Sequence, residues 1–195
     1  MIIEDWFPTQ FFMDDMPEFL PETKACFTNI EERKSYQKPD HYNGATTYPQ
    51  DVLLWDVPLM SFRSALDMKL AEMAVQQNIN MEEYDVKVSS IWCNRMFLNS
   101  SHAVHAHPGA PFVGTYYVNC PEGSSSVRFH NPIAQLWLNS QMPTKNRSNY
   151  ETVQFVPREG MLLLWNGWVP HDVMEHQVSE PRDSISFNAV ITPRS

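Results

Sequence analysis

The stretch PRDSISFNAVI, residues 181–191, decides the fold that we expect for this chain. Polar and apolar side chains alternate along it, which is the pattern of a β-strand with two different faces. The polar face carries Arg182, Ser184, Ser186 and Asn188, and the apolar face carries Ile185, Phe187 and Ala189. The alternation therefore predicts a strand with one face on a hydrophobic core and the other on a polar interior.

Further segments with the composition of β-strands fill the chain between about residue 84 and this strand. They are short, rich in β-branched and aromatic residues, and separated by turns that contain Pro, Gly, Asn and Ser. They cover residues 84–99, 110–120, 125–132, 151–157, 160–166 and 171–178. So many short strands in succession predict a mainly β protein, an antiparallel β-sandwich or jelly roll. Such a barrel encloses a small cavity that suits a metal ion.

The first part of the chain is expected to support this β-rich half. Phe62, Leu66, Leu70 and Met73 recur at helical spacing within residues 59–77, which predicts a helix packed against a sheet. The segment 3–13 is a strand candidate that Pro8 interrupts.

We expect one domain over residues 1–195. In it, residues 1 to about 84 would supply the supporting strand and helix, and residues from about 85 to 195 would form the metal-binding core.

Composition excludes several classes of function. The chain has 195 residues, 43% hydrophobic and 12% aromatic, which favours a packed globular protein. Its formal net charge is -9 and it has no cluster of Lys and Arg, so binding to a phosphate backbone is disfavoured.

Location is also predicted from composition. No apolar run is long enough to span a membrane, and the acidic N-terminus lacks the basic region of a signal peptide. Cys26, Cys93 and Cys120 are few and widely spaced, as is typical of reduced thiols. We therefore expect a cytoplasmic protein that binds a small-molecule or peptidyl substrate, with no nucleic acid or membrane as partner. The oligomeric state is not predicted.

Histidines supply the first candidate site. His105 and His107 are two residues apart, so in an extended strand both imidazoles point to the same side. Pro108 favours an extended conformation at His107. Imidazole nitrogens suit iron, zinc, copper and nickel, so the pair predicts two ligands of a metal. His41, His102, His130 and His176 are expected to be ordinary hydrogen-bonding groups. Among these four, His102 is the first alternative candidate for contact with the ligands or the substrate.

A second and more selective pattern lies downstream. His171 is followed by ten residues, then Arg182, one residue and Ser184. Because an unpaired buried charge is costly, an arginine on an interior face requires an anion. A carboxylate held by the guanidinium and the neighbouring hydroxyl is the natural partner.

Together these residues resemble a known family. HAHP (105–108), GTYYV (114–118), PHDV (170–173) and RDSISFN (182–188) are similar to motifs of the Fe(II)/2-oxoglutarate-dependent dioxygenases. The match is closest to the prolyl-hydroxylase-like branch, and within it to small members from bacteria and phages. The resemblance covers about residues 90–192 and implies a double-stranded β-helix, which is a jelly-roll fold related to the cupins.

The resemblance also implies roles for individual residues. His105 and His171 would bind Fe(II), and Arg182 with Ser184 would hold the C5 carboxylate of 2-oxoglutarate. Tyr116 would donate to the same carboxylate; we prefer it to Tyr117 on alignment, although only one of the two can face the cavity.

The implied reaction is hydroxylation of an amino-acid-like or protein substrate with formation of succinate and CO2, with ascorbate as an optional reductant. No catalytic residue is expected beyond the metal ligands. Asn94 and Trp168, which lie before the first histidine motif and before His171, are candidates for substrate binding.

His107 departs from the family pattern, which commonly has Asp or Glu at this position. We expect His107 to be the third ligand, and Asp172 to point away from the site because it alternates with His171. Three imidazoles also suit a cupin-type dioxygenase that does not use 2-oxoglutarate, and a non-catalytic jelly-roll binding protein is the third alternative.

Overall fold

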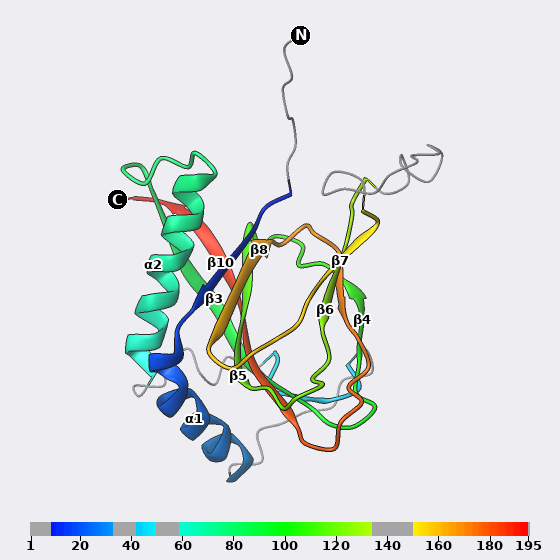
Figure 1. Ribbon diagram of the computed structural model, residues 1–195. Helices are drawn as coiled ribbons and strands as arrows, with labels where there is room; N and C mark the ends of the chain where they lie inside the picture. Colours follow the sequence, from blue (N-terminus) through cyan, green and yellow to red (C-terminus); the bar gives the residue numbers. More distant parts are fainter. Residues whose placement is uncertain (1–8, 33–41, 50–58, 134–149, 195) are drawn as a thin grey trace.

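The computed structural model describes residues 9–32, 42–49, 59–133 and 150–194. Two antiparallel sheets face each other, and two helices lie on the outer side of the larger sheet (Figure 1). The mainly β architecture predicted from the sequence is confirmed.

The larger sheet has six strands in the order β1-β8-β5-β10-β3-β2. Their bounds are Phe11–Asp15 for β1, Met161–Asn166 for β8, Phe112–Asn119 for β5, Arg182–Pro193 for β10, Tyr84–Met96 for β3 and Ala45–Thr46 for β2. The smaller sheet has four strands in the order β4-β9-β6-β7. Their bounds are His102–His105 for β4, His171–Val173 for β9, Val127–His130 for β6 and Thr152–Phe155 for β7.

Strand β10 lies in the middle of the larger sheet, between β5 and β3. Its apolar residues Ile185, Phe187 and Ala189 are fully buried in the core under the helices. Its polar residues line a cavity on the opposite face; they are Arg182, Ser184, Ser186 and Asn188. The predicted alternation is therefore observed, up to an irregularity in the pairing with β3 after Asn188.

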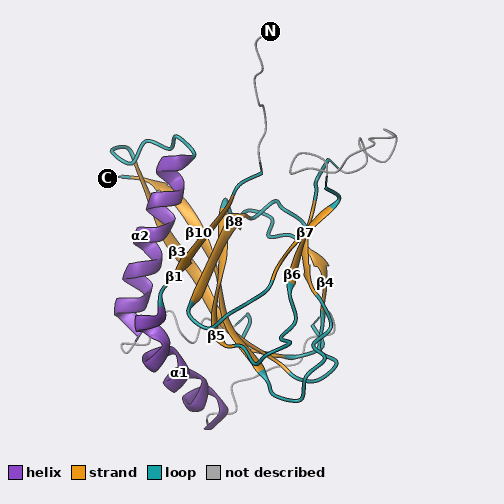
Figure 2. Ribbon diagram, in the orientation of Figure 1, coloured by secondary structure: helices purple, strands orange, loops and turns teal. Residues whose placement is uncertain are grey.

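Helix α2 (Met60–Gln76) packs against β3 and buries Phe62, Leu66, Leu70 and Met73, as predicted. The short 3-10 helix η1 (Pro17–Phe19) and helix α1 (Leu20–Glu32), which packs on β5, were not predicted. The spacing of apolar residues does not predict helix α1, because its buried face includes the polar Thr23. The Thr23 hydroxyl donates to the Phe19 carbonyl oxygen. Figure 2 shows both helices on one side of the larger sheet and the smaller sheet on the other.

The N-terminal part contributes strands to the larger sheet. β1 pairs with β8 along the full length of β1, and β2 pairs with β3. The part of the expected strand over residues 3–8 lies outside the described residues, as does His41. Within the described part of the chain, no helix is long and apolar enough to cross a membrane. Cys26, Cys93 and Cys120 form no disulfide.

Candidate metal centre and cosubstrate pocket

Three histidines that the sequence analysis singled out lie together between the two sheets. The candidate ligand nitrogens of His105, His107 and His171 lie within 4.8 Å of one another. His105 ends β4 and His171 begins β9, and the two residues pair directly across these antiparallel strands. The His107 ring is parallel to the His171 ring, at 1°, with 5.2 Å between ring centroids. The structure thus forms a three-His site.

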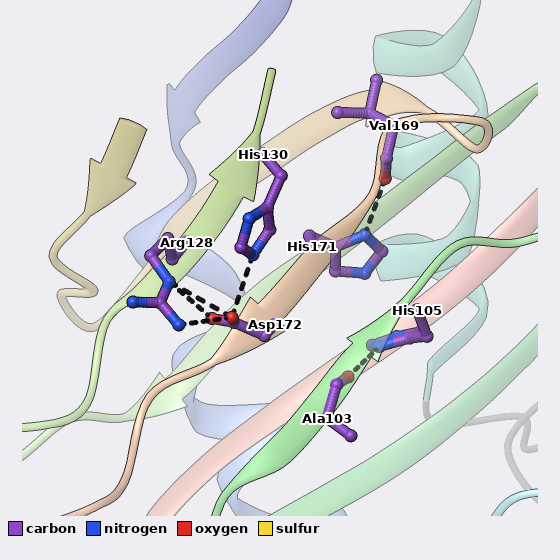
Figure 3. Close-up of polar contacts among 7 residues, drawn as sticks. All are labelled: Ala103, His105, Arg128, His130, Val169, His171 and Asp172. Carbon is purple, nitrogen blue, oxygen red and sulfur yellow. Dashed lines mark hydrogen bonds and ion pairs between the residues drawn. The ribbon is translucent and has the colours of Figure 1, made fainter. Parts of the chain in front are cut away.

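Backbone carbonyl groups set the tautomer of two of these imidazoles. His105 Nδ1 lies 2.8 Å from the Ala103 carbonyl oxygen, and His171 Nδ1 lies 3.0 Å from that of Val169 (Figure 3). Because a carbonyl oxygen only accepts, each Nδ1 carries the hydrogen, and Nε2 keeps its lone pair. This is the arrangement that orients imidazoles as metal ligands.

The electrostatic environment disfavours a positive charge on two of the three imidazoles. Burial and the neighbouring His105 lower the pKa of His171 from 6.5 to about 3. Burial and His105 also lower the pKa of His107, to about 4, against the opposing effect of a hydrogen bond with the Asn188 side chain. The imidazoles of His107 and His171 are therefore neutral at neutral pH, the form that binds a cation. Imidazole nitrogens fit Fe(II) and equally fit other first-row metals.

A tight turn at the end of β8 positions His107. The His107 backbone N–H donates to the Gly167 carbonyl oxygen at 2.8 Å, and the Ala110 N–H donates back to the His107 carbonyl oxygen at 3.1 Å. A Cβ at position 167 would collide with the Ala110 carbonyl oxygen and lie 3.0 Å from that of His107. Only glycine permits this approach of the two segments. The sequence indicated a turn at this place, but not its contact with the metal site.

A cavity of about 340 Å³ extends from the three histidines between the sheets. Arg182 and Ser184 line it, and both are almost fully buried. Among the described residues, three cavity-lining side chains each have a buried polar atom without a hydrogen-bond partner. They are Tyr42 Oη, Trp165 Nε1 and Arg182 Nε. A cavity that binds a polar ligand presents unpaired buried polar atoms of this kind.

Arg182 is held in place but not neutralised. Its Nη1 donates to the Ser125 carbonyl oxygen at 2.7 Å and to Ser125 Oγ at 3.2 Å, and its guanidinium lies 5.5 Å from the Tyr117 ring centroid. The adjacent Asp183 pairs with Arg95 instead, at 2.6 Å. Within the described ranges, no carboxylate forms an ion pair with Arg182. A buried cation of this kind is stabilised by a bound anion.

The predicted role of Tyr116 is wrong. Its hydroxyl donates to the Met16 carbonyl oxygen at 2.8 Å, and its ring packs against Phe62 in the core under the helices. Tyr117 pairs with Ser184 across β5 and β10, so both side chains lie on the cavity face. The pairing register, which cannot be obtained from β5 alone, decides which tyrosine faces inward.

The two candidate substrate-binding residues are placed differently. Asn94 lines the cavity, where its Oδ1 accepts from Thr46 Oγ1 at 2.7 Å and its Nδ2 donates to Ser186 Oγ at 3.0 Å. Trp168 is 51% exposed and does not line the cavity, whereas Trp165 does. The position of Trp168 in the turn after β8 takes its side chain to the surface, so a role of Trp168 in substrate binding stays a prediction.

Asp172 points away from the three histidines, as expected from strand alternation. Its carboxylate accepts from Arg128 Nη2 at 2.7 Å and contacts His130 Nε2 at 3.0 Å, on the opposite face of the smaller sheet (Figure 3). His176 is also outside the metal site. It is fully buried and its Nε2 lies 2.8 Å from the Glu180 carbonyl oxygen, so it is a structural residue rather than a solvated one.

His102 lies next to the site, where its ring stacks on that of His105 and is tilted against that of Tyr42. Its ring centroid lies 3.9 Å from that of His105 and 5.0 Å from that of Tyr42. The sequence analysis assigned no site role to Tyr42 or Ser125, because neither belongs to a motif that points to ligand binding.

Comparison with known proteins agrees with this site. The model of the 2OG-Fe(II) oxygenase family matches residues 90–188, about half of the chain. The chain therefore belongs to the 2OG-Fe(II) oxygenases. It is an oxidoreductase whose cofactors are iron and 2-oxoglutarate. No curated protein has significant sequence similarity to it.

Solved structures with similar folds include several oxygenases. A prolyl-4-hydroxylase from Pseudomonas putida has a TM-score of 0.62 at 11% identity, covering 92% of each chain. A prolyl hydroxylase from Trichoplax adhaerens, solved with a peptide fragment of hypoxia inducible factor, has a TM-score of 0.65 at 12% identity, covering 92% of this chain and 82% of the other. HygX from Streptomyces hygroscopicus, solved with nickel, 2-oxoglutarate and hygromycin B, has a TM-score of 0.63 at 14% identity, covering 93% and 82%. At these identities the likeness concerns the fold, and it confirms the predicted jelly roll.

Proposed function

We propose that this oxygenase hydroxylates an amino-acid-like or protein substrate, with His105, His107 and His171 as its metal ligands. The observation that carries the assignment is the shared cavity of Arg182 and the three histidines, because the buried guanidinium lacks a carboxylate partner among the described residues. A five-carbon diacid that reaches from Arg182 to the metal satisfies both ends of this cavity. Charge complementarity and burial both support this arrangement.

The residues have separate roles in this proposal. The three imidazoles hold Fe(II), which, when bound together with 2-oxoglutarate and O2, supplies the oxidising chemistry of the family. Arg182, Ser184 and Tyr117 bind and orient the distal carboxylate of 2-oxoglutarate. The facing sheets exclude water from the cavity, so that side reactions with solvent are suppressed.

The rest of the cavity supports a neutral substrate group near the metal. Asn94 offers an amide that is already oriented by Thr46 and Ser186, and Trp92 lies near His107 with its ring centroid 6.2 Å away. Apart from the histidines, Arg182 is the one ionisable cation among the described lining residues, and no described carboxylate lines the cavity. The proteins of similar fold include one solved with a peptide and one solved with a small molecule. The proposed substrate accordingly covers both classes, peptidyl and small-molecule.

We also propose that residues 1–195 act as one domain, since β1, β2 and α2 all belong to or cover the larger sheet that carries Arg182. The unpaired thiols of Cys26, Cys93 and Cys120 support a reducing, cytoplasmic location.

Turnover of labelled 2-oxoglutarate tests the proposed function. Purified protein is incubated with Fe(II), ascorbate and labelled 2-oxoglutarate, and release of CO2 is measured. We expect decarboxylation by the parent and its loss in Arg182→Ala and His171→Ala. Equal decarboxylation by the parent and both variants would overturn the assignment.

The second candidate is a three-His dioxygenase that does not use 2-oxoglutarate, and His107 favours it because it stands where a carboxylate is common. Titration of 2-oxoglutarate into the metal-loaded protein separates the two. Metal-dependent binding with a visible absorption band supports the first function, and no binding supports the second. The family match favours the first function over the second, and it also favours an enzyme over a non-catalytic binding protein.

A further inference from the structure

Tyr42 lies outside the segment that matches the family, yet it lines the same cavity as Arg182. The residue is 5% exposed, and its hydroxyl is buried without a hydrogen-bond partner. A buried hydroxyl in this state is costly unless a ligand satisfies it. Tyr42 is not among the residues to which the proposed function assigns a role.

The backbone holds Tyr42 firmly at the cavity wall. Tyr42 forms an isolated β-bridge with His102, and the next residue, Asn43, donates its backbone N–H to the Ser101 carbonyl oxygen at 3.1 Å. The ring folds over Gly44, where a Cβ would lie 2.6 Å from Tyr42 Cζ and 2.8 Å from the Arg95 carbonyl oxygen. The inward position of the ring therefore depends on glycine at position 44.

The positive charge of Arg182 affects the pKa of the Tyr42 hydroxyl. Burial raises the pKa of Tyr42, and the positive charge of Arg182 opposes that rise. Tyr42 therefore stays a neutral hydrogen-bond donor at neutral pH. Arg182 Nε is a second buried donor without a partner. Two unsatisfied donors beside an uncompensated positive charge are complementary to an anion with several acceptor oxygens, which is a carboxylate.

We propose that Tyr42 donates its hydroxyl hydrogen to the distal carboxylate of 2-oxoglutarate beside Arg182. The N-terminal segment, outside the family-matched residues, then completes the cosubstrate pocket and contributes to selection of a diacid. This inference rests on the proposed function, in which Arg182 binds that carboxylate.

Calorimetric titration of the anaerobic Fe(II)-loaded protein tests the inference without turnover. Two probes are used: 2-oxoglutarate, and 2-oxobutyrate, which has the same keto-acid end but no distal carboxylate. For Tyr42→Phe we expect the dissociation constant of 2-oxoglutarate to rise about tenfold and that of 2-oxobutyrate to stay unchanged. The control is Tyr48→Phe, which changes a cavity-lining tyrosine that is 44% exposed, and neither constant should move.

The outcomes separate the inference from the proposed function. If the parent protein does not bind 2-oxoglutarate, the proposed function is wrong. If the parent binds it and Tyr42→Phe binds it equally well, only the role of Tyr42 is wrong. Equal weakening of both probes would also overturn the role, since it would show a general effect on the site.

Thermal unfolding of the ligand-free protein serves as the control for correct folding of the variants. Because the Tyr42 hydroxyl has no partner within the protein, Tyr42→Phe should unfold at the parent's temperature or slightly above. A second variant, Gly44→Ala, forces the ring away and should weaken 2-oxoglutarate binding selectively. Retention of parental affinity for 2-oxoglutarate by this variant would contradict the proposed position of the hydroxyl.

Discussion

His105 and His171 face each other across the antiparallel pair of β4 and β9, with ring centroids 4.2 Å apart. The two residues are distant in the sequence, and it is the strand pairing that makes them neighbours. Strand pairing therefore holds two of the three candidate ligands side by side, which preorganises this part of the site before any metal binds.

The histidines differ in their expected effect on metal content. Because His105 and His171 present Nε2 to the shared site, His105→Ala and His171→Ala should lose stoichiometric Fe(II). His102→Phe keeps a ring stacked on His105 and removes no candidate ligand, so it should retain the metal. Elemental analysis of protein purified without a histidine tag measures this. Equal loss in all three variants would contradict the ligand assignment.

Acid should destabilise the metal-free protein through its buried imidazoles. The pKa of His107 is about 4 and that of His171 about 3 in the folded protein, against 6.5 for an ordinary histidine. Between pH 6.5 and these values the unfolded chain binds more protons than the folded chain. The contribution of the two imidazoles to stability is therefore complete above about pH 6.5 and falls as the pH decreases toward about 3. The melting temperature should follow this trend, with a shallower slope in His171→Gln. Identical slopes in parent and variant would show that these groups do not control it.

The two adjacent tyrosines of β5 should respond in opposite ways. Tyr116→Phe removes the hydrogen bond to the Met16 carbonyl oxygen and should lower the free energy of unfolding by about 1 kcal/mol, with no change in 2-oxoglutarate affinity. Tyr117→Leu removes the ring beneath Arg182 and should weaken 2-oxoglutarate binding. Denaturant unfolding and calorimetric titration measure the two effects. If Tyr116→Phe weakened 2-oxoglutarate binding and Tyr117→Leu did not, Tyr116 would be the tyrosine that faces the cavity.

Asp172 should matter for stability and not for metal content. Asp172→Ala breaks the contacts with Arg128 and His130 and should cost about 1–3 kcal/mol, an intermediate value because Arg128 is partly exposed. The carboxylate lies on the opposite face from the three histidines, so Fe(II) should remain stoichiometric. Loss of Fe(II) from a variant that is still folded would instead identify Asp172 as a ligand.

Local pattern was sufficient wherever one strand or one motif carried the information. The alternation of residues 182–189 predicted which side chains of β10 face the cavity. The two histidines of HAHP do meet at one site, but the predicted shared strand is wrong: β4 ends at His105, and the contact with Gly167 positions His107. Helix α2 was predicted from its apolar spacing, whereas α1 was not, because its buried face is partly polar.

The chain itself thus determined the fold class, the three histidines and the arginine of the site, because periodicity and motif spacing are local properties of the sequence. Only the tertiary structure decided that Tyr117 and not Tyr116 faces the cavity, since a strand's facing depends on its register with a partner. Only the tertiary structure could bring Tyr42 and Ser125 to the cavity of Arg182, because both residues are remote from Arg182 in the sequence and belong to no motif of the site. Their positions follow from how the two sheets close on each other.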